Sequence, residues 1–520
     1  MDRLGADLPP GRQGPRKVHN PGQALFRAHG FRRPCFDLEH LLRGTEGARM
    51  VPHDGIHLGL CRARPYGPPR AVEDATNSGG EMKLWMCISL AMGMSIGCMP
   101  RRGETPLWPF TKKVLPNGLT VFVKEVHTVP LVAVFLWART GSANEPDSLC
   151  GISHFLEHMF FKGTKLHPKG EMDRIVKRLG GYNNAFTGIE YTGYYIVVPS
   201  EHFSTAFGLL YDAMTGSVFP PEEIELERKV IEEEIRRRDD SPTGKLHQMF
   251  LENLFKGTPY ARPVLGTSET LARIKREHFL EYLRDYYVPN NVVAVVVGDV
   301  ETRKVLDEVR SCTQGWRPDP EVTKRLSEIN FVPGTEPRTC EVERDVNQTY
   351  WILGFPAPGI GEPDEYPLEL AATVLGSGRS SRLWRRLVER EGLVTTVSAW
   401  YWPLRYAGAF GVEAHFPPEN RGKVEEAVWE EIRRLKEEPV GEEELEKAKT
   451  MLLADFAYDN ESCADIAETL GYYAVVSSVD HALDYPEKVR KVTAEQVREA
   501  VRRHLREDAY TLCVLEPKSP

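Results

Sequence analysis

Residues 151–160 read Gly-Ile-Ser-His-Phe-Leu-Glu-His-Met-Phe and contain the pattern H-x-x-E-H. On a helix, His154 and His158 lie one turn apart on the same face, so both imidazoles can bind one Zn²⁺. Glu157 lies beside His158, where its carboxylate can serve as a general base. The alternative is a helix with two surface histidines and an acid, but histidine is only 15 of 520 residues, so a chance match is rare. The pattern therefore predicts a zinc site on this helix.

A catalytic zinc ion usually takes a third protein ligand and keeps one position open. The acidic segment 222–235 offers candidates, and a helical pattern is expected there. Glu227 and Glu234 are seven residues apart, which places them two turns apart on one face. Spacing alone does not choose among these acids, and a solvated acidic helix face is the alternative for any one of them.

Around this segment, the chain from residue 114 onward predicts two similar α+β halves. Apolar and β-branched runs predict strands, and longer periodic stretches between them predict helices. The segment 313–337 is rich in proline and charge and is the expected linker between a domain at 99–312 and a homologous domain at 338–520. The expected strands are 119–123, 131–137, 191–198, 291–297, 348–355, 396–401, 409–415 and 510–515. The expected helices are 150–163, 171–179, 202–214, 222–238, 278–286, 366–375, 381–391, 423–437, 442–458 and 494–505.

Composition excludes several classes of protein. The chain is 27% charged with a formal net charge of −9, which argues against a nucleic-acid-binding surface, because such a surface is basic. No apolar run reaches the ~20 residues of a membrane-spanning helix. The nine cysteines are dispersed and form no C-x-x-C pair, so neither a thiolate zinc ribbon nor a dithiol redox motif is expected.

The N-terminal residues differ from the rest of the chain. Residues 1–81 are rich in Gly and Pro without an apolar period, so we expect this segment to be disordered or untranslated, with Met82 as the initiator. Residues 82–98 resemble a secretory signal, with Lys83 before an apolar stretch and Ser-Ile-Gly-Cys at its end. We favour a lipoprotein signal with Cys98 as the lipidated residue. A plain signal peptide, an uncleaved anchor and an ordinary apolar segment are the alternatives.

Four segments together resemble the pitrilysin/insulinase family of zinc peptidases, and within it the bacterial branch that is similar to mitochondrial processing peptidase. The resemblance covers about 400 residues. The segments are LPNGL at 115–119, HFLEHMFFKGT at 154–164, GGYNNAFT at 180–187 and ERKVIEEEI at 227–235. The resemblance implies two homologous domains, each a mostly antiparallel sheet packed with helices.

The resemblance also assigns roles to the candidate residues. It implies that His154, His158 and Glu234 bind one zinc ion per chain, that Glu157 is the general base, and that Glu227 orients a ligand histidine. It further implies that a peptide substrate adds as a strand to a sheet edge, with a plain turn and strand as the alternative. The residues of that edge are Asn184, Ala185, Phe186 and Thr187.

One motif of the family is incomplete. Self-sufficient members carry an Arg and a Tyr in a segment that resembles L-R-E-x-x-G-L-x-Y, and here Val388 and Thr395 stand in those places. We therefore expect a homologous partner chain to supply the Arg/Tyr pair to a zinc endopeptidase that cleaves peptides or unfolded segments. The alternative is a non-catalytic binding or assembly subunit. The expected location is the bacterial cell envelope, with membrane attachment only through a lipid anchor.

Overall fold

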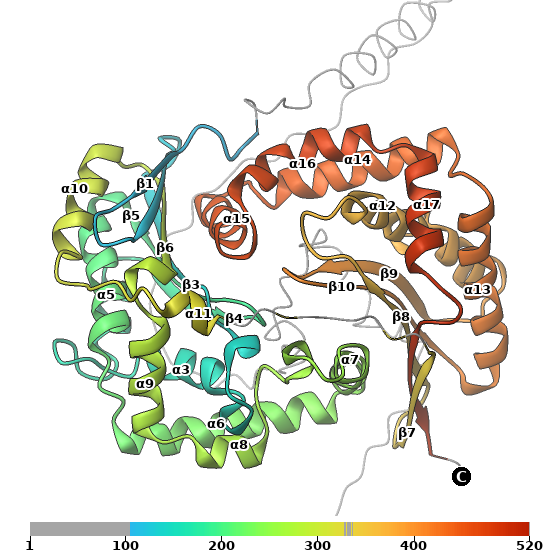
Figure 1. The fold of residues 1–520 in the computed structure, drawn as a ribbon, viewed down its shortest axis with the longest axis horizontal. Coiled ribbons are helices and arrows are strands. Elements are labelled where there is room, and N and C mark those ends of the chain that lie inside the picture. The colour runs from blue at the N-terminus through green and yellow to red at the C-terminus, as the bar shows by residue number, and fades with distance from the viewer. Residues whose placement is uncertain (1–104, 327–328, 330–333, 335, 519–520) are drawn as a thin grey trace, which may run out of the picture.

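The computed structural model describes residues 105–326, 329, 334 and 336–518, and these residues form two sheets with helices packed around them (Figure 1). The expectations for residues 1–81 and 82–98, including lipidation at Cys98, lie outside the described residues. No helix in the described ranges combines the length and the apolar character needed to cross a membrane.

The first sheet has six strands in the order β1-β2-β6-β3-β5-β4. Every neighbouring pair is antiparallel except β2 and β6, which are parallel. The central strand β6 is a β-branched run that is buried along its whole length, as expected for a strand covered on both faces. The strands are β1 (Thr111–Val114), β2 (Thr120–Glu125), β3 (Leu131–Ala138), β4 (Tyr182–Thr187), β5 (Thr192–Pro199) and β6 (Val292–Gly298).

The second sheet repeats this arrangement. Its order is β7-β11-β8-β10-β9, and again only one pair, β7 with β11, is parallel. The order matches β2-β6-β3-β5-β4 strand for strand, so the expected fold of two similar, mostly antiparallel α+β halves is confirmed. The strands are β7 (Arg338–Arg344), β8 (Thr349–Ala357), β9 (Thr396–Pro403), β10 (Gly408–Phe416) and β11 (Thr511–Pro517).

The helices follow the same duplicated order. The first half contains α3 (Ile152–Phe160), α4 (Glu171–Arg178), α5 (Phe203–Gly216), α6 (Pro221–Asp240), α7 (Pro242–Leu254), α8 (Ser268–Arg273), α9 (Arg276–Tyr286), α10 (Thr302–Cys312) and α11 (Val322–Arg325). The second half contains α12 (Glu365–Gly376), the π-helical segment η8 (Trp384–Arg390), α13 (Arg421–Glu437), α14 (Glu442–Tyr458), α15 (Cys463–Val476), α16 (Val479–Lys491) and α17 (Ala494–His504). Sequence patterns missed α7, α8, α10, α15 and α16, and the segment expected as a linker carries α11.

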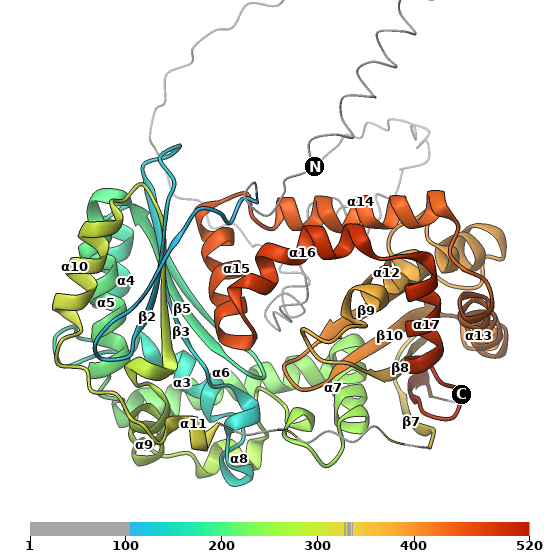
Figure 2. The ribbon, with the colours of Figure 1, turned by 45° about the horizontal axis from the view of Figure 1, so that its top comes forward.

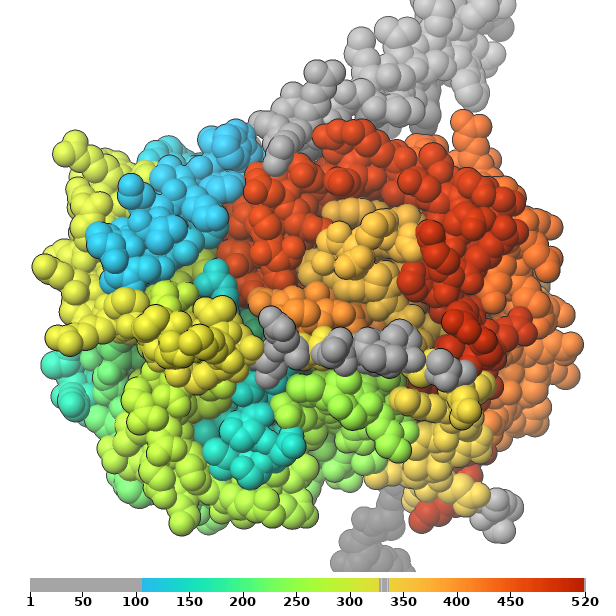
Figure 3. Space-filling view, viewed as in Figure 1, coloured from blue at the N-terminus to red at the C-terminus, as the bar shows by residue number. Residues whose placement is uncertain are grey.

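The two halves exchange a helix. Helix α7 of the first half packs on β8 and β11 of the second sheet, whereas α15 of the second half packs on β3 and β6 of the first sheet (Figures 1 and 2). The exchange places the buried Trp137 of β3 directly against Gly471 of α15. Figure 3 shows the green surface of the α7 region lying against the yellow and orange second half. Each sheet is therefore covered on one face by a helix from the other half, which fixes the halves relative to each other.

Candidate metal centre

Helix α3 carries the H-x-x-E-H pattern and is positioned at its N-terminus by a buried acid. Glu145 accepts hydrogen bonds from the backbone N–H groups of Gly151 and Ser153, at 2.7 and 2.8 Å, and so caps the helix. Gly151 has φ of +94°, and a Cβ there would come within 2.8 Å of the Gly266 Cα atom. Both the turn and the close approach therefore require glycine at the start of α3.

Three predicted ligands converge where α3 packs against α6. The Glu234 Oε2 atom lies 3.7 Å from His154 Nε2 and 3.5 Å from His158 Nε2. Zinc holds such atoms at about 2.1 Å, so two ligands at a tetrahedral angle lie about 3.4 Å apart. Among the described residues, no other group of three His, Cys, Asp or Glu side chains brings its ligand atoms within 4.8 Å of one another. The donor set and its spacing therefore fit one zinc ion.

Glu227 lies behind His158, on the side away from Glu234. Its Oε2 atom is 3.1 Å from His158 Nδ1, and its Oε1 atom accepts a 2.5 Å hydrogen bond from Lys162 Nζ. Burial opposes ionisation of Glu227, but the bonds from His158 and Lys162 outweigh burial and lower its pKa. Glu227 thereby fixes the ring of His158 with Nε2 facing Glu234, as an orienting carboxylate does. Lys162, two residues beyond the end of α3, was missed by the sequence analysis.

The charges around the two imidazoles suit a cation. Burial and the neighbouring His158 ring lower the pKa of His154, which keeps its imidazole in the neutral form that binds metals. Burial also opposes protonation of His158, but its hydrogen bonds to Glu227 and Glu234 raise its pKa to about 10. The carboxylates that favour a positive charge on His158 would equally favour a divalent cation bound beside its neutral imidazole.

Glu157 is held by the neighbouring sheet edge. Thr187, the last residue of β4, donates a 2.5 Å hydrogen bond from Oγ1 to Glu157 Oε2. Strand β4 is the last strand in its sheet, so its outer backbone groups are open to a further strand. Thr187 was predicted as a substrate-binding residue, and its contact with Glu157 adds a positioning role that sequence spacing could not indicate.

The other residues predicted for the substrate edge all lie in β4, where successive side chains face opposite sides of the sheet. Ala185 is buried in the core on the α3 side. Phe186 packs on the opposite side, against Trp137 at a ring distance of 4.9 Å. Asn184 is exposed on the same strand. The structure thus brings all four residues onto one free sheet edge beside Glu157.

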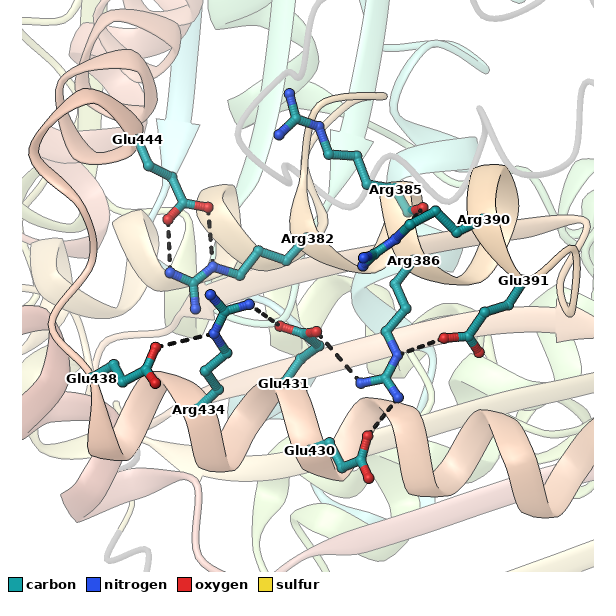
Figure 4. Close-up of polar contacts among 10 residues, drawn as sticks. All are labelled: Arg382, Arg385, Arg386, Arg390, Glu391, Glu430, Glu431, Arg434, Glu438 and Glu444. Atoms are coloured by element: carbon teal, nitrogen blue, oxygen red, sulfur yellow. Dashed lines mark hydrogen bonds and ion pairs between the residues drawn. The ribbon is translucent and has the colours of Figure 1, made fainter.

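The second half offers no equivalent metal site in its described residues, and α12 contains no histidine. Val388 lies in η8 and packs against the core, while the Thr395 hydroxyl donates to the backbone carbonyl of His415. Two arginines in and beside η8 form ion pairs with acids of the second half. Figure 4 shows Arg382 turned to Glu444 and Arg386 turned to the glutamates of α13, so these guanidinium groups hold η8 in place.

Comparisons with known proteins match both halves. The family described as "Insulinase (Peptidase family M16)" matches residues 120–268, and "Peptidase M16 inactive domain" matches residues 273–452. An "Uncharacterized zinc protease" of Rickettsia bellii is 31% identical, with 79% of this chain aligned to 98% of that protein. A protein of the same description, YmxG of Bacillus subtilis, is 29% identical, with 77% of this chain and 97% of that protein aligned.

A solved structure agrees with these relatives. A protease from Helicobacter pylori superposes with a TM-score of 0.73 and 26% sequence identity, covering 79% of this chain and all of that one. Three observations indicate the same family. They are the duplicated sheets, the two histidines beside Glu234, and relatives that are described as zinc proteases. The chain therefore belongs to the insulinase (M16) family of peptidases.

Proposed function

We propose that this protein is a zinc-dependent endopeptidase of the H-x-x-E-H (inverzincin) type, with one zinc ion per chain, that hydrolyses peptides or unfolded polypeptide segments. The observation that carries the proposal is the convergence of His154, His158 and Glu234 at 3.5–3.7 Å with Glu157 fixed beside them. A structural zinc site has no use for Glu157, whereas hydrolysis needs a base at that place.

The residues of the chain divide the chemistry among them. When bound to His154, His158 and Glu234, zinc acts as a Lewis acid that polarises the scissile carbonyl and favours ionisation of a water molecule. Glu157 takes the proton from the attacking water and passes it to the leaving amine. The open edge of β4 binds the substrate backbone as an added strand, which selects extended peptides over folded proteins.

We also propose that a homologous partner chain completes the site. Val388 and Thr395 offer neither a guanidinium nor a phenolic donor for the substrate, and a second copy of this chain lacks them as well. A partner with that Arg/Tyr pair would close a chamber around the zinc site. We place the complex in the bacterial cell envelope, on the basis of the signal-like residues 82–98.

Glu157→Gln tests the enzyme against the alternative of a non-catalytic subunit. Zinc-loaded wild type and variant are compared for bound zinc by atomic absorption and, each mixed with the homologous partner chain, for cleavage of an unstructured fluorogenic peptide. We expect unchanged zinc content and a loss of about 10²–10⁴-fold in kcat, the usual contribution of a general base. Cleavage at the wild-type rate by the variant would exclude Glu157 as the base, whereas no cleavage by either protein would favour the assembly role.

The partner is tested by adding the homologous chain that carries the Arg/Tyr motif. We expect cleavage by the mixture to exceed that of this chain alone, and to disappear when the zinc site of this chain carries Glu234→Gln. Full activity of the isolated chain would contradict the need for a partner.

A further inference from the structure

Two cysteines that are far apart in the chain lie side by side in the second sheet. Cys340 of β7 is the direct parallel neighbour of Cys513 in β11. Neighbouring strands lie about 4.8 Å apart, and residues in register point to the same face of the sheet. Disulfides join residues whose Cα atoms are about 4.4–6.8 Å apart, so this register brings the two thiols within bridging reach.

Both thiols lie on the face of the second sheet that the exchanged helix α7 covers. Cys513 is buried in an apolar cluster that contains residues of α7, and Cys340 packs against the same cluster. Burial and the adjacent Cys340 thiol raise the pKa of Cys513. Among the described cysteines, only these two lie in strands. The fold therefore brings together one specific pair of thiols, which the sequence separates by most of a domain.

The strand that carries Cys340 is paired on one side only. β7 is the edge strand of its sheet, and β11 is its neighbour within that sheet. Arg338 of β7 donates a 2.6 Å hydrogen bond to the backbone carbonyl of Asn253 in α7. Arg344, at the other end of β7, donates to the backbone carbonyl of Asp239 in α6. A covalent bond between β7 and β11 would therefore fix both the edge of the second sheet and its contact with the first half.

We infer that Cys340 and Cys513 form a disulfide bond that joins the first and last strands of the second half. The inference does not depend on the proposed peptidase function. The bond closes a loop of almost the whole second half, and a crosslink across a long loop stabilises mainly by restricting the unfolded chain. An oxidising compartment, such as the bacterial cell envelope proposed above, favours the bond.

The bond forms by thiol–disulfide exchange with a disulfide oxidant, either a small molecule or a protein of the cell envelope. Cys340 is partly exposed and Cys513 is buried, so the Cys340 thiolate attacks first. It breaks the S–S bond of the oxidant, forms a mixed disulfide and releases one thiol. Cys513 then attacks the Cys340 sulfur and releases the second thiol. The two protein thiols thereby lose two electrons and two protons, which the oxidant takes up as its two thiols.

Peptide mapping of the full chain tests the bond. The folded protein is incubated with oxidised glutathione, its remaining thiols are alkylated in denaturant, and a tryptic digest is analysed by mass spectrometry without reduction. Trypsin releases the two cysteines in the fragments TCEVER (339–344) and EDAYTLCVLEPK (507–518). We expect these fragments to appear linked, two hydrogens lighter than their sum, and to separate on reduction. Cys312→Ala, at an exposed cysteine of α10, is the control and should retain the link.

Thermal unfolding measures the stabilisation that the bond provides. We expect oxidation to raise the unfolding temperature of the wild type and of Cys312→Ala by about 5 °C or more, as a crosslink over a long loop should. Oxidation should leave the unfolding temperatures of Cys340→Ala and Cys340→Ser unchanged. Separate alkylated fragments after oxidation, or a Cys340 that retains bound glutathione, overturn the disulfide. A linked wild type that unfolds at the temperature of the reduced protein overturns the stabilising role.

Discussion

The exchanged helix α7 is joined to the second sheet by a buried ion pair, and this pair provides the sharpest test of how the halves are held together. His247 Nε2 lies 2.8 Å from Glu413 Oε2 on β10, with side chains 17% and 14% exposed. His415 contacts the other oxygen of Glu413 at 3.1 Å. His247→Gln keeps a neutral donor and removes the charge. A charge-assisted bond exceeds a neutral one by about 1.5 kcal/mol, so the variant should be less stable by about that amount.

The stability lost in His247→Gln should depend on pH, and the direction of that dependence follows from the pKa values of His247 and Glu413. Burial alone lowers the pKa of His247, but the charge and hydrogen bond of Glu413 outweigh burial and raise it above 6.5. Burial opposes ionisation of Glu413, yet His247 and His415 lower its pKa below 4.5. The histidine contribution is complete below pH 6.5 and is lost as the pH rises through the raised value. The glutamate contribution is complete above pH 4.5 and is lost in acid. The pair therefore stabilises most between pH 4.5 and 6.5.

Urea unfolding of the metal-free protein at pH 6 and pH 9.5, followed by tryptophan fluorescence, measures both effects. We expect His247→Gln to lose about 1.5 kcal/mol at pH 6 and clearly less at pH 9.5. His202→Ala is the control, because its partner Glu201 is 79% exposed and such pairs contribute little. A loss that is equal at both pH values, or no larger than that of the control, would refute the charged pair.

Two further changes test the capping of α3 and the contact between the halves. Glu145→Ala removes both hydrogen bonds that cap α3, so it should lower the free energy of unfolding in urea by about 3 kcal/mol. The control is Asp147→Ala in the same loop, whose side chain is 87% exposed, and it should lower that free energy by under about 0.5 kcal/mol. Similar losses in the two variants would contradict the cap. Gly471→Ala would place a Cβ 2.0 Å from the Trp137 Nε1 atom and should cost about 2 kcal/mol or more in thermal unfolding. Gly208→Ala in α5 meets nothing within 4 Å and should stabilise by about 0.5 kcal/mol; equal behaviour of the two alanines would rule out the tight contact.

Local pattern was sufficient for much of the fold. The β-branched run of β6 and the continuous apolar runs of β3 and β8 predict strands, because a strand that is buried on both faces consists of apolar residues along its length. Helices α7 and α15 escaped prediction because each is packed by the other half, so their apolar positions reflect distant partners. The helix expected at 381–391 is instead π-helical over Trp384–Arg390, and Arg386 holds that segment on α13 through ion pairs.

For the site, the sequence by itself determined the two histidines and Glu157, because a helical repeat fixes which side chains share a face regardless of the rest of the chain. The helical spacing could not select Glu234 from the other acids of α6, since several of them are compatible with that spacing. Only the packing of α3 against α6 distinguishes them. Only the tertiary structure decided that choice and the bond from Thr187 to Glu157. Each depends on contacts between segments that are far apart in the chain, and local periodicity does not indicate which distant segments pack together.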